Sequence, residues 1–222
     1  MSSRKSWLTA SVIAAVLVYA AMWIGYAQNW VWLDAVDTQL LQTFHNIGAT
    51  RPGWVSFWDV FCTVFGPNGF RVVGLVFVIV ALIRRKVATA AFLVVSIGLM
   101  GLVTEGAKVI AGRPRPEMAL VYGSSTSFPS GHALGVMVGV LALLTVLWPS
   151  LTRRWRTVLA VLGGVLVALV GSARVVLNVH HPSDVLAGWA LGYLYYLLCL
   201  RLVPPRGISS AAERRAAPDT GP

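Results

Sequence analysis

Long apolar stretches alternate with short polar ones along this chain. Six of the apolar stretches are long enough to cross a lipid bilayer as helices, which takes roughly 17 to 25 residues each. The predicted spans are Trp7–Ala27, Pro67–Ile83, Ala88–Ala107, His132–Trp148, Thr157–Leu177 and Val185–Val203. The polar stretches between them contain Gly, Pro and charged residues, which favour turns and helix ends. The pattern therefore predicts an all-α, polytopic membrane protein with six transmembrane helices.

Composition agrees with this prediction. Of the 222 residues, 57% are hydrophobic and 12% are charged, whereas soluble proteins average about 25% charged residues. No internal repeat or long linker divides the chain, so residues 1–203 are predicted to form one membrane domain. Residues 204–222 are small, polar and Pro-containing, and are predicted to form a disordered cytoplasmic tail.

The net charge of +10 raises the question of a nucleic-acid partner. Most basic residues, however, flank alternate ends of the spans, as the positive-inside rule expects of cytoplasmic loops. We therefore predict no nucleic-acid partner, a location in the plasma or inner membrane, and both termini in the cytoplasm. The residues that follow the rule are Arg4, Lys5, Arg84, Arg85, Lys86, Arg153, Arg154, Arg156, Arg201, Arg206, Arg214 and Arg215.

A smaller group of basic residues falls on the outer side or within the membrane. Basic residues kept on the side that the rule disfavours indicate an anionic ligand rather than a role in topology. The group consists of Arg51, Arg71, Lys108, Arg113, Arg115 and Arg174, and the last four belong to the polar clusters described next.

Three polar clusters interrupt the apolar pattern, at Lys108–Arg115, Pro129–His132 and Arg174–Asp184. Counting spans from a cytoplasmic N-terminus brings all three to the outer, extracytoplasmic face. Ser130 is placed to cap the helix that follows, and Gly131 lets an anion approach the backbone there.

The last cluster contains a candidate nucleophile. Pro182 suits the first turn of a helix, so Asp184 falls in that turn, where the helix dipole favours a carboxylate. A carboxylate beside an imidazole fixes its tautomer and makes the other ring nitrogen a better nucleophile. His180 is the candidate for that role.

Together the clusters predict an anion cradle with a nucleophile, which suits phosphoryl transfer. Apart from Asp184 the nearby acids are Glu105 and Glu117, too few for a two-metal site. Glu105 is expected to pair with Lys108 three residues on. We therefore predict no metal and no cofactor.

At these residues the chain resembles the type 2 phosphatidic acid phosphatase (PAP2) superfamily of lipid phosphatases, which is related to vanadium haloperoxidases and glucose-6-phosphatase. Lys108 and Arg115-Pro116 match the first motif of the family, Pro129–His132 the second, and Arg174, His180 and Asp184 the third. Ala173 stands where the third motif has Ser, and the adjacent Ser172 is a candidate auxiliary residue.

The resemblance implies a six-helix PAP2-like bundle and a role for each matched residue. His180 would attack phosphorus to form a phosphohistidine while Asp184 orients it, and His132 would protonate the leaving oxygen and then activate water. The implied phosphate-binding residues are Lys108, Arg115, Ser130, Gly131 and Arg174. Arg113 is either an auxiliary residue or a direct phosphate contact, and His181 is interpreted as a neighbour without a role of its own.

Two classes of function remain open. The first is an enzyme that removes phosphate from a membrane lipid, with polyprenyl diphosphate favoured and phosphatidylglycerophosphate or phosphatidic acid as alternatives. The second is a non-catalytic membrane protein or transporter that binds anionic lipid. Such a binder needs the cations but not His132 or the pairing of His180 with Asp184.

Other residues are given structural interpretations. The Trp-rich segment from Gln28 to Phe65 is predicted to lie outside the membrane, where Asp34, Asp37 and Asp59 are solvated and His45 is a loop histidine. Cys62 and Cys199 fall near opposite faces, so no disulfide joins them. Gly98, Gly101 and Gly106 are small residues suited to close helix contact.

Overall fold

The computed structural model describes residues 2–123 and 125–205, with side chains from residue 5 onward, so most of the predicted tail lies outside it. Every regular element in these ranges is helical, which confirms the predicted fold class. The elements are α1 (Ser2–Ala27), α2 (Val31–Gly48), α3 (Pro52–Phe65), α4 (Pro67–Ile83), α5 (Val87–Leu93), a π-helical turn η1 (Val94–Gly98), α6 (Leu99–Ala111), α7 (Gly131–Leu147), a 3₁₀ turn η2 (Trp148–Ser150), α8 (Arg153–Val176) and α9 (Pro182–Leu202).

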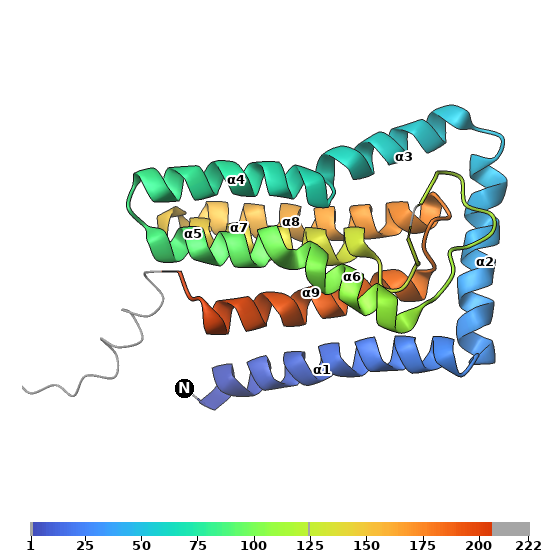
Figure 1. Cartoon of the computed structure of the whole chain (residues 1–222), viewed down its shortest axis with the longest axis horizontal. Helices are drawn as coiled ribbons and strands as arrows, with labels where there is room; N and C mark the ends of the chain where they lie inside the picture. Colours follow the sequence, from blue (N-terminus) through green and yellow to red (C-terminus); the bar gives the residue numbers. More distant parts are fainter. Residues whose placement is uncertain (1, 124, 206–222) are drawn as a thin grey trace, which may run out of the picture.

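Six candidate membrane spans are present among the described residues, as predicted, and they run side by side (Figure 1). The predicted bounds of the second span, Pro67–Ile83, are wrong, because this span runs over Pro52–Ile83 and includes α3. The predicted start of this span at Pro67 is instead a junction, because Gly66 joins α3 to α4 within one apolar element. Pro67 occupies the first turn of α4, where its missing N–H costs no hydrogen bond.

α2 crosses the end of the bundle, roughly perpendicular to the spans (Figure 1). Its buried residues are Leu33, Asp37, Leu41 and Gly48, a spacing that puts them on one helix face. The predicted solvation of Asp37 is therefore wrong, since its side chain is only 1% exposed. Asp34, three residues before Asp37 on the same helix, is exposed as predicted.

α7 forms the centre of the bundle and packs against α4, α8 and α9. Gly188 and Gly192 let α9 approach it closely, because a Cβ atom at Gly192 would lie 2.7 Å from the carbonyl oxygen of Leu134. Four-residue spacing of small residues is a common device for packing membrane helices. The core thus fixes the end of α9 that begins with Pro182 against the start of α7.

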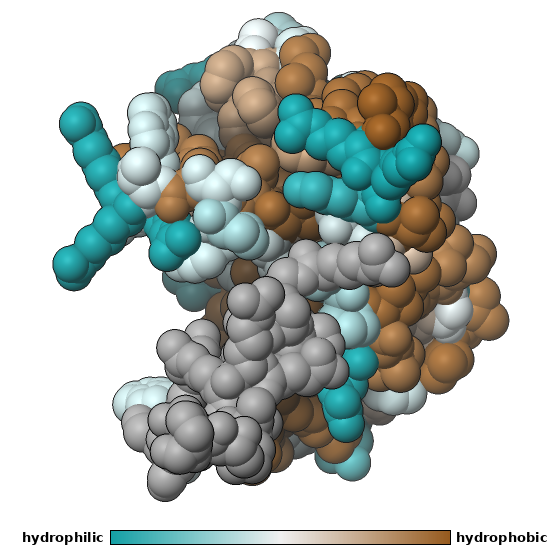
Figure 2. All heavy atoms as spheres, turned by 90° about the vertical axis from the view of Figure 1, so that its left-hand side faces the viewer, coloured by the Kyte–Doolittle hydropathy of each residue, from teal (hydrophilic) through white to brown (hydrophobic). Residues whose placement is uncertain are grey.

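The two ends of the bundle differ in charge. The described loop residues that follow the positive-inside pattern lie where α1 begins, where α4 meets α5, where α7 meets α8 and where α9 ends. Figure 2 looks at this end and shows hydrophilic side chains projecting from it, with hydrophobic ones around them. Cys62 and Cys199 are both free and buried, which confirms the absence of a disulfide between them.

Candidate active site

A pocket of about 560 Å³ opens in the other half of the bundle, where α6 ends, α7 begins and α8 turns into α9. The three polar clusters meet there, as the count of membrane crossings between them predicted. The predicted site residues that line it are Lys108, Arg115, Gly131, His132, Arg174 and His180.

The loop between α8 and α9 presents His180 to the pocket. Asn178 in this loop has a left-handed backbone (φ 54°) and donates a hydrogen bond from Nδ2 to the carbonyl oxygen of Leu41 at 2.8 Å. Pro182 begins α9, and the Oδ2 atom of Asp184 accepts the N–H of His181 at 2.8 Å. The predicted position of Asp184 in the first turn is confirmed.

His180 lies between a carboxylate and a guanidinium. Its Nδ1 atom is 3.6 Å from Oδ2 of Asp184, just beyond hydrogen-bond distance, and its Nε2 atom is 3.4 Å from Nη1 of Arg115. A guanidinium can only donate, so we assign the ring proton to Nδ1 and the lone pair to Nε2. The imidazole is thus oriented with its acceptor nitrogen on the side of the pocket cations.

The charge state of His180 follows from its burial. Its side chain is almost fully buried, and this burial lowers the pKa of His180 to about 4. Asp184 acts to raise this pKa, whereas Arg174 and Arg115 lower it further. At neutral pH the ring is therefore uncharged, as a nucleophile must be.

Cationic side chains surround this nitrogen. Lys108 donates from Nζ to Oγ of Ser125 at 2.5 Å and lies 3.8 Å from Glu105, the ion pair that the sequence predicted. Arg115 donates to the carbonyl oxygens of Ser125 and Val179, each at 2.7 Å. The partners of Arg115 are uncharged and leave its positive charge uncompensated, whereas Lys108 has one long ion pair with Glu105, whose side chain is 63% exposed.

Arg174 supplies a third cation, from the last turn of α8. Its side chain is buried, and its Nε atom has no hydrogen-bond partner among the described residues. A buried donor without a partner is costly. An anion bound in the pocket would satisfy it.

The start of α7 forms another wall of the pocket. Oγ of Ser130 accepts the N–H of Ala133 at 3.4 Å, so Ser130 caps the helix as predicted, and Gly131 lines the pocket while Ser130 does not. The ring of His132 lies directly against Gly66, where a Cβ atom would be 2.9 Å from its Cδ2 atom. The break between α3 and α4 thus makes room for this histidine.

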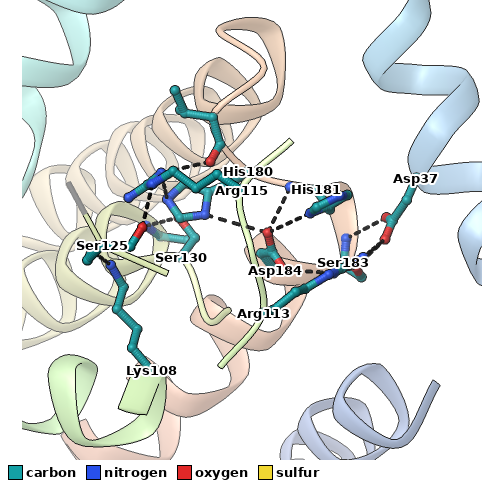
Figure 3. A network of polar contacts seen from close by, with 12 residues as sticks. Asp37, Lys108, Arg113, Arg115, Ser125, Ser130, His180, His181, Ser183 and Asp184 are labelled. Carbon is teal, nitrogen blue, oxygen red and sulfur yellow. Dashed lines mark hydrogen bonds and ion pairs between the residues drawn. The ribbon is translucent and has the colours of Figure 1, made fainter. Parts of the chain in front are cut away.

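A buried polar network supports Asp184 from behind (Figure 3). Arg113 donates from Nη1 to Oδ1 of Asp184 at 2.7 Å and from Nη2 to Oδ2 of Asp37 at 2.9 Å. Asp37 also accepts the backbone N–H of Ser183 at 3.0 Å. Arg113 therefore contacts the carboxylates of Asp184 and Asp37 and is not among the residues that line the pocket. The part of Asp37 in this network was not predicted from the sequence.

The remaining candidates divide between the site and its surroundings. His181 lies 3.2 Å from Oδ2 of Asp184 and is a neighbour of the site. Asp59, expected in solvent, is half-buried and lines the pocket. His45 belongs to α2 and not to a loop, and its Nδ1 atom lies 3.1 Å from the carbonyl oxygen of Met118. Ser172 is exposed on α8 and does not line the pocket.

Fold and site together define an integral membrane protein in which a neutral histidine faces a pocket of cations. The chain belongs to the PAP2 superfamily, whose family model matches residues 89–208, more than half of its length. The matched region includes all three polar clusters.

Similar proteins include a phosphatidylglycerophosphatase B of Bacillus subtilis, 39% identical over 89 residues, which are 39% of this chain and 44% of that protein. An undecaprenyl-diphosphatase of Sulfolobus acidocaldarius is 42% identical over 66 residues, 30% of this chain and 28% of that protein. These matches span less than half the length of either relative.

One solved structure has the same fold. It is the crystal structure of a transmembrane PAP2-type phosphatidylglycerolphosphate phosphatase from Bacillus subtilis, with a TM-score of 0.72 and 22% sequence identity. The similarity covers 94% of this chain and 98% of that one. The six-helix bundle predicted from the sequence is thus a PAP2 fold.

Proposed function

We propose that the chain hydrolyses the terminal phosphate of a membrane lipid through a phosphohistidine intermediate. The observation that carries this proposal is the surroundings of His180, whose one nitrogen faces a carboxylate and whose other nitrogen, uncharged, faces a pocket of cations. A nucleophile needs a free lone pair, and a phosphoryl group needs positive charge around its oxygens. Both requirements meet at this residue.

In the first step Nε2 of His180 attacks phosphorus, and the bond from phosphorus to the lipid oxygen breaks. His132 gives its proton to that oxygen. In the second step His132 takes a proton from water, whose oxygen attacks phosphorus and releases inorganic phosphate, restoring the free imidazole. General acid and base help of this kind contributes on the order of 10² to 10⁴ in rate.

The positive groups act on the phosphoryl oxygens in both steps. Fixed donors stabilise the charge that spreads over these oxygens in the transition state without reorganising. We assign this role to Lys108, Arg115, Arg174 and the start of α7 at Gly131, with Ser130 holding that helix end. Asp184 keeps the His180 ring oriented and stabilises the positive charge that it gains on attack.

We further propose that the substrate is a lipid with a small phosphorylated head group and that the site faces the extracytoplasmic side. Polyprenyl diphosphate is our first choice, with phosphatidylglycerophosphate and phosphatidic acid as alternatives. The names of two relatives, a phosphatidylglycerophosphatase and an undecaprenyl-diphosphatase, support the first two. The distribution of basic loop residues supports the orientation.

A non-catalytic binder of anionic lipid is the competing function. Attraction to lipid phosphate would need the cations of the pocket, but it gives no reason to bury an uncharged histidine beside a carboxylate. Burying a histidine and a carboxylate together costs folding free energy, and such arrangements are typical of catalytic sites. We therefore favour the enzyme.

Phosphate release from a short-chain lipid phosphate tests the proposal. Wild type should release phosphate in the presence of a chelator, and His180→Asn should lose at least about 10³-fold of the rate, because no nucleophile remains. His45→Gln is the matched control and should keep its rate. Equal release by wild type and His180→Asn would exclude the proposed chemistry.

The intermediate is tested separately. Rapid alkaline quenching of wild type with a ³²P-labelled substrate should yield label that stays on the protein in base and is lost in acid, as a phosphorus–nitrogen bond requires. His180→Asn should carry none. Turnover without protein-bound label at any quench time would favour direct attack by water.

A further inference from the structure

Arg71 is a charged residue inside a candidate membrane span, on the second turn of α4. Ionisable side chains within spans are costly, and where they occur they line a bundle interior or a wet cavity and mark a binding site. The mechanism proposed above does not use this residue.

Among the described residues, no acid forms an ion pair with Arg71. Its Nη1 atom donates to Oδ1 of Asn68 at 2.7 Å, one helical turn earlier. Within the described part of the chain no carboxylate lies at ion-pair distance from its guanidinium, and Glu105, on the same pocket, pairs with Lys108. The charge of Arg71 is therefore available to a ligand.

The side chain of Arg71 reaches from α4 to α6. A Cβ atom at Gly101 would lie 2.7 Å from Nη2 of Arg71, so the guanidinium rests on the α6 backbone and glycine makes the room. Of the three glycines predicted to allow close helix contact, Gly101 alone does so. A Cβ atom at Gly98 would contact only a side-chain carbon of its own element, and a Cβ atom at Gly106 would contact no other element.

Arg71 shares the pocket of the proposed nucleophile. The residues Asn68, Arg71 and Gly101 line the same pocket as Lys108 and His180. Gly101 and Lys108 are seven residues apart on α6, which at 1.5 Å per residue separates their levels by about 10 Å. Arg71 thus lies farther along the pocket than the groups assigned to the reacting phosphate.

Beyond Arg71 the surroundings become apolar. A groove of about 290 Å³ between α4 and the π-helical turn begins at Arg71 and is lined by Gly74, Leu75, Val78, Leu93, Val94, Ile97 and Gly98. The guanidinium therefore marks the boundary between a polar pocket and an apolar surface.

We propose that Arg71, together with Asn68, forms a second anion subsite, which binds the phosphate that stays on the lipid when the terminal phosphate is removed. This inference rests on the proposed function. Polyprenyl diphosphates and phosphatidylglycerophosphate both carry such a phosphate between the reacting group and the apolar chains, whereas phosphatidic acid has none. A planar guanidinium with several donors suits a phosphate at this boundary. The subsite selects lipids with two phosphates.

The test compares three substrates in detergent micelles, namely farnesyl diphosphate, short-chain phosphatidylglycerophosphate and short-chain phosphatidic acid. Arg71→Ala should lower kcat/KM for at least one of the two-phosphate lipids by about tenfold or more, mainly through KM, as the loss of a charged hydrogen bond predicts. For phosphatidic acid the change should stay within about twofold. The two-phosphate lipid that loses more identifies the source of the second phosphate.

Two further variants separate recognition from general effects. Arg71→Lys should recover part of the loss, because it restores the charge but not the fork of donors. Arg51→Ala removes the same charge from an exposed position at the start of α3, outside the pocket, and should behave as wild type with all three lipids.

The outcomes are distinct. Equal losses with all three lipids would mean that Arg71 supports the bundle, and unchanged kinetics would mean that it touches no substrate; either result overturns the subsite while wild-type hydrolysis upholds the proposed function. A wild type inactive on all three lipids would overturn both.

Discussion

His180 contacts Arg115 through Nε2 and is deeply buried, and the burial decides its charge. An exposed histidine titrates near about 6.5, whereas burial lowers the pKa of His180 to about 4. The ring is therefore protonated only as the pH falls through about 4 and is neutral above it. We expect the ¹³C-labelled ring resonance that disappears in His180→Asn to titrate near 4 in the substrate-free protein.

This measurement has a clear contrary result. A midpoint close to the ordinary value of about 6.5 would show that water reaches the ring in the resting state, and burial would then not keep His180 neutral. The same pKa should set the acid limb of kcat/KM, which reports the free enzyme.

Gly66 affects the proposed acid and base without carrying any chemistry. A Cβ atom there would lie 2.9 Å from Cδ2 and 3.2 Å from Nε2 of His132 and would collide with the carbonyl oxygen of Cys62. Gly66→Ala should therefore displace the His132 ring, and displacements of about 1 Å cost on the order of 10²-fold in rate. Steady-state kcat measures the effect.

The matched control for Gly66→Ala is Gly106→Ala. Apart from the neighbouring backbone of α6 itself, nothing lies within 4 Å of a Cβ at Gly106, so this variant should keep its activity. Equal rates for the two variants would show that the His132 ring accommodates a methyl group.

At the scale of elements, a buried carboxylate helps to join α2 to the site. Asp37 is buried between Arg113 and Ser183, which connect it to Asp184 and the start of α9. Removing one partner of a buried ion pair costs about 3–5 kcal/mol. Asp37→Ala should lower the free energy of unfolding by an amount near the lower end of this range, because Arg113 keeps Asp184 as a partner. A denaturing detergent titration measures the change.

Asp34 provides the control for this prediction on the same helix. It is exposed, so Asp34→Ala should change the free energy of unfolding by no more than about 1 kcal/mol, the size of a helix-dipole effect. If the two variants prove equally stable, α2 is held by its apolar contacts at Leu33 and Leu41 and not by the buried pair.

How much the sequence predicts depends on whether the cause is local. Ser130 and Pro182 act within one helical turn, and the three motifs have fixed spacing, so the caps, the spans and the meeting of the clusters were predictable. Asp37 and Arg113 are 76 residues apart, and nothing near Asp37 in the sequence marks its partner. The one available signal was its place between Leu33 and Leu41, on the apolar face of an amphipathic segment.

The second span shows the same limit. Gly66-Pro67 is a strong local turn signal, but apolar residues continue on both sides, and the packing of Gly66 against His132 turns a helix end into a break within one span. The placement of Asp59 in the pocket follows from this long-range packing and not from its own neighbourhood.

For the whole molecule, the bundle separates two kinds of positive charge. Basic loop residues gather at the end where α1 begins and α9 ends, while Lys108, Arg115 and Arg174 line the pocket in the other half. The first group follows the positive-inside rule, and the second belongs to the proposed phosphate site. The basic loop residues therefore bear on the orientation of the protein in the membrane, and the pocket residues bear independently on its function.

Orientation is tested by single cysteines in a chain with Cys62 and Cys199 replaced by Ala. Tyr122 is 90% exposed beside the pocket, and Ser150 is exposed between α7 and α8 at the opposite end. A membrane-impermeant maleimide should label Tyr122→Cys in intact cells and Ser150→Cys only after permeabilisation. The reverse pattern would put the pocket in the cytoplasm and contradict the proposed orientation, while the hydrolytic chemistry, which depends on contacts within the bundle, would stand.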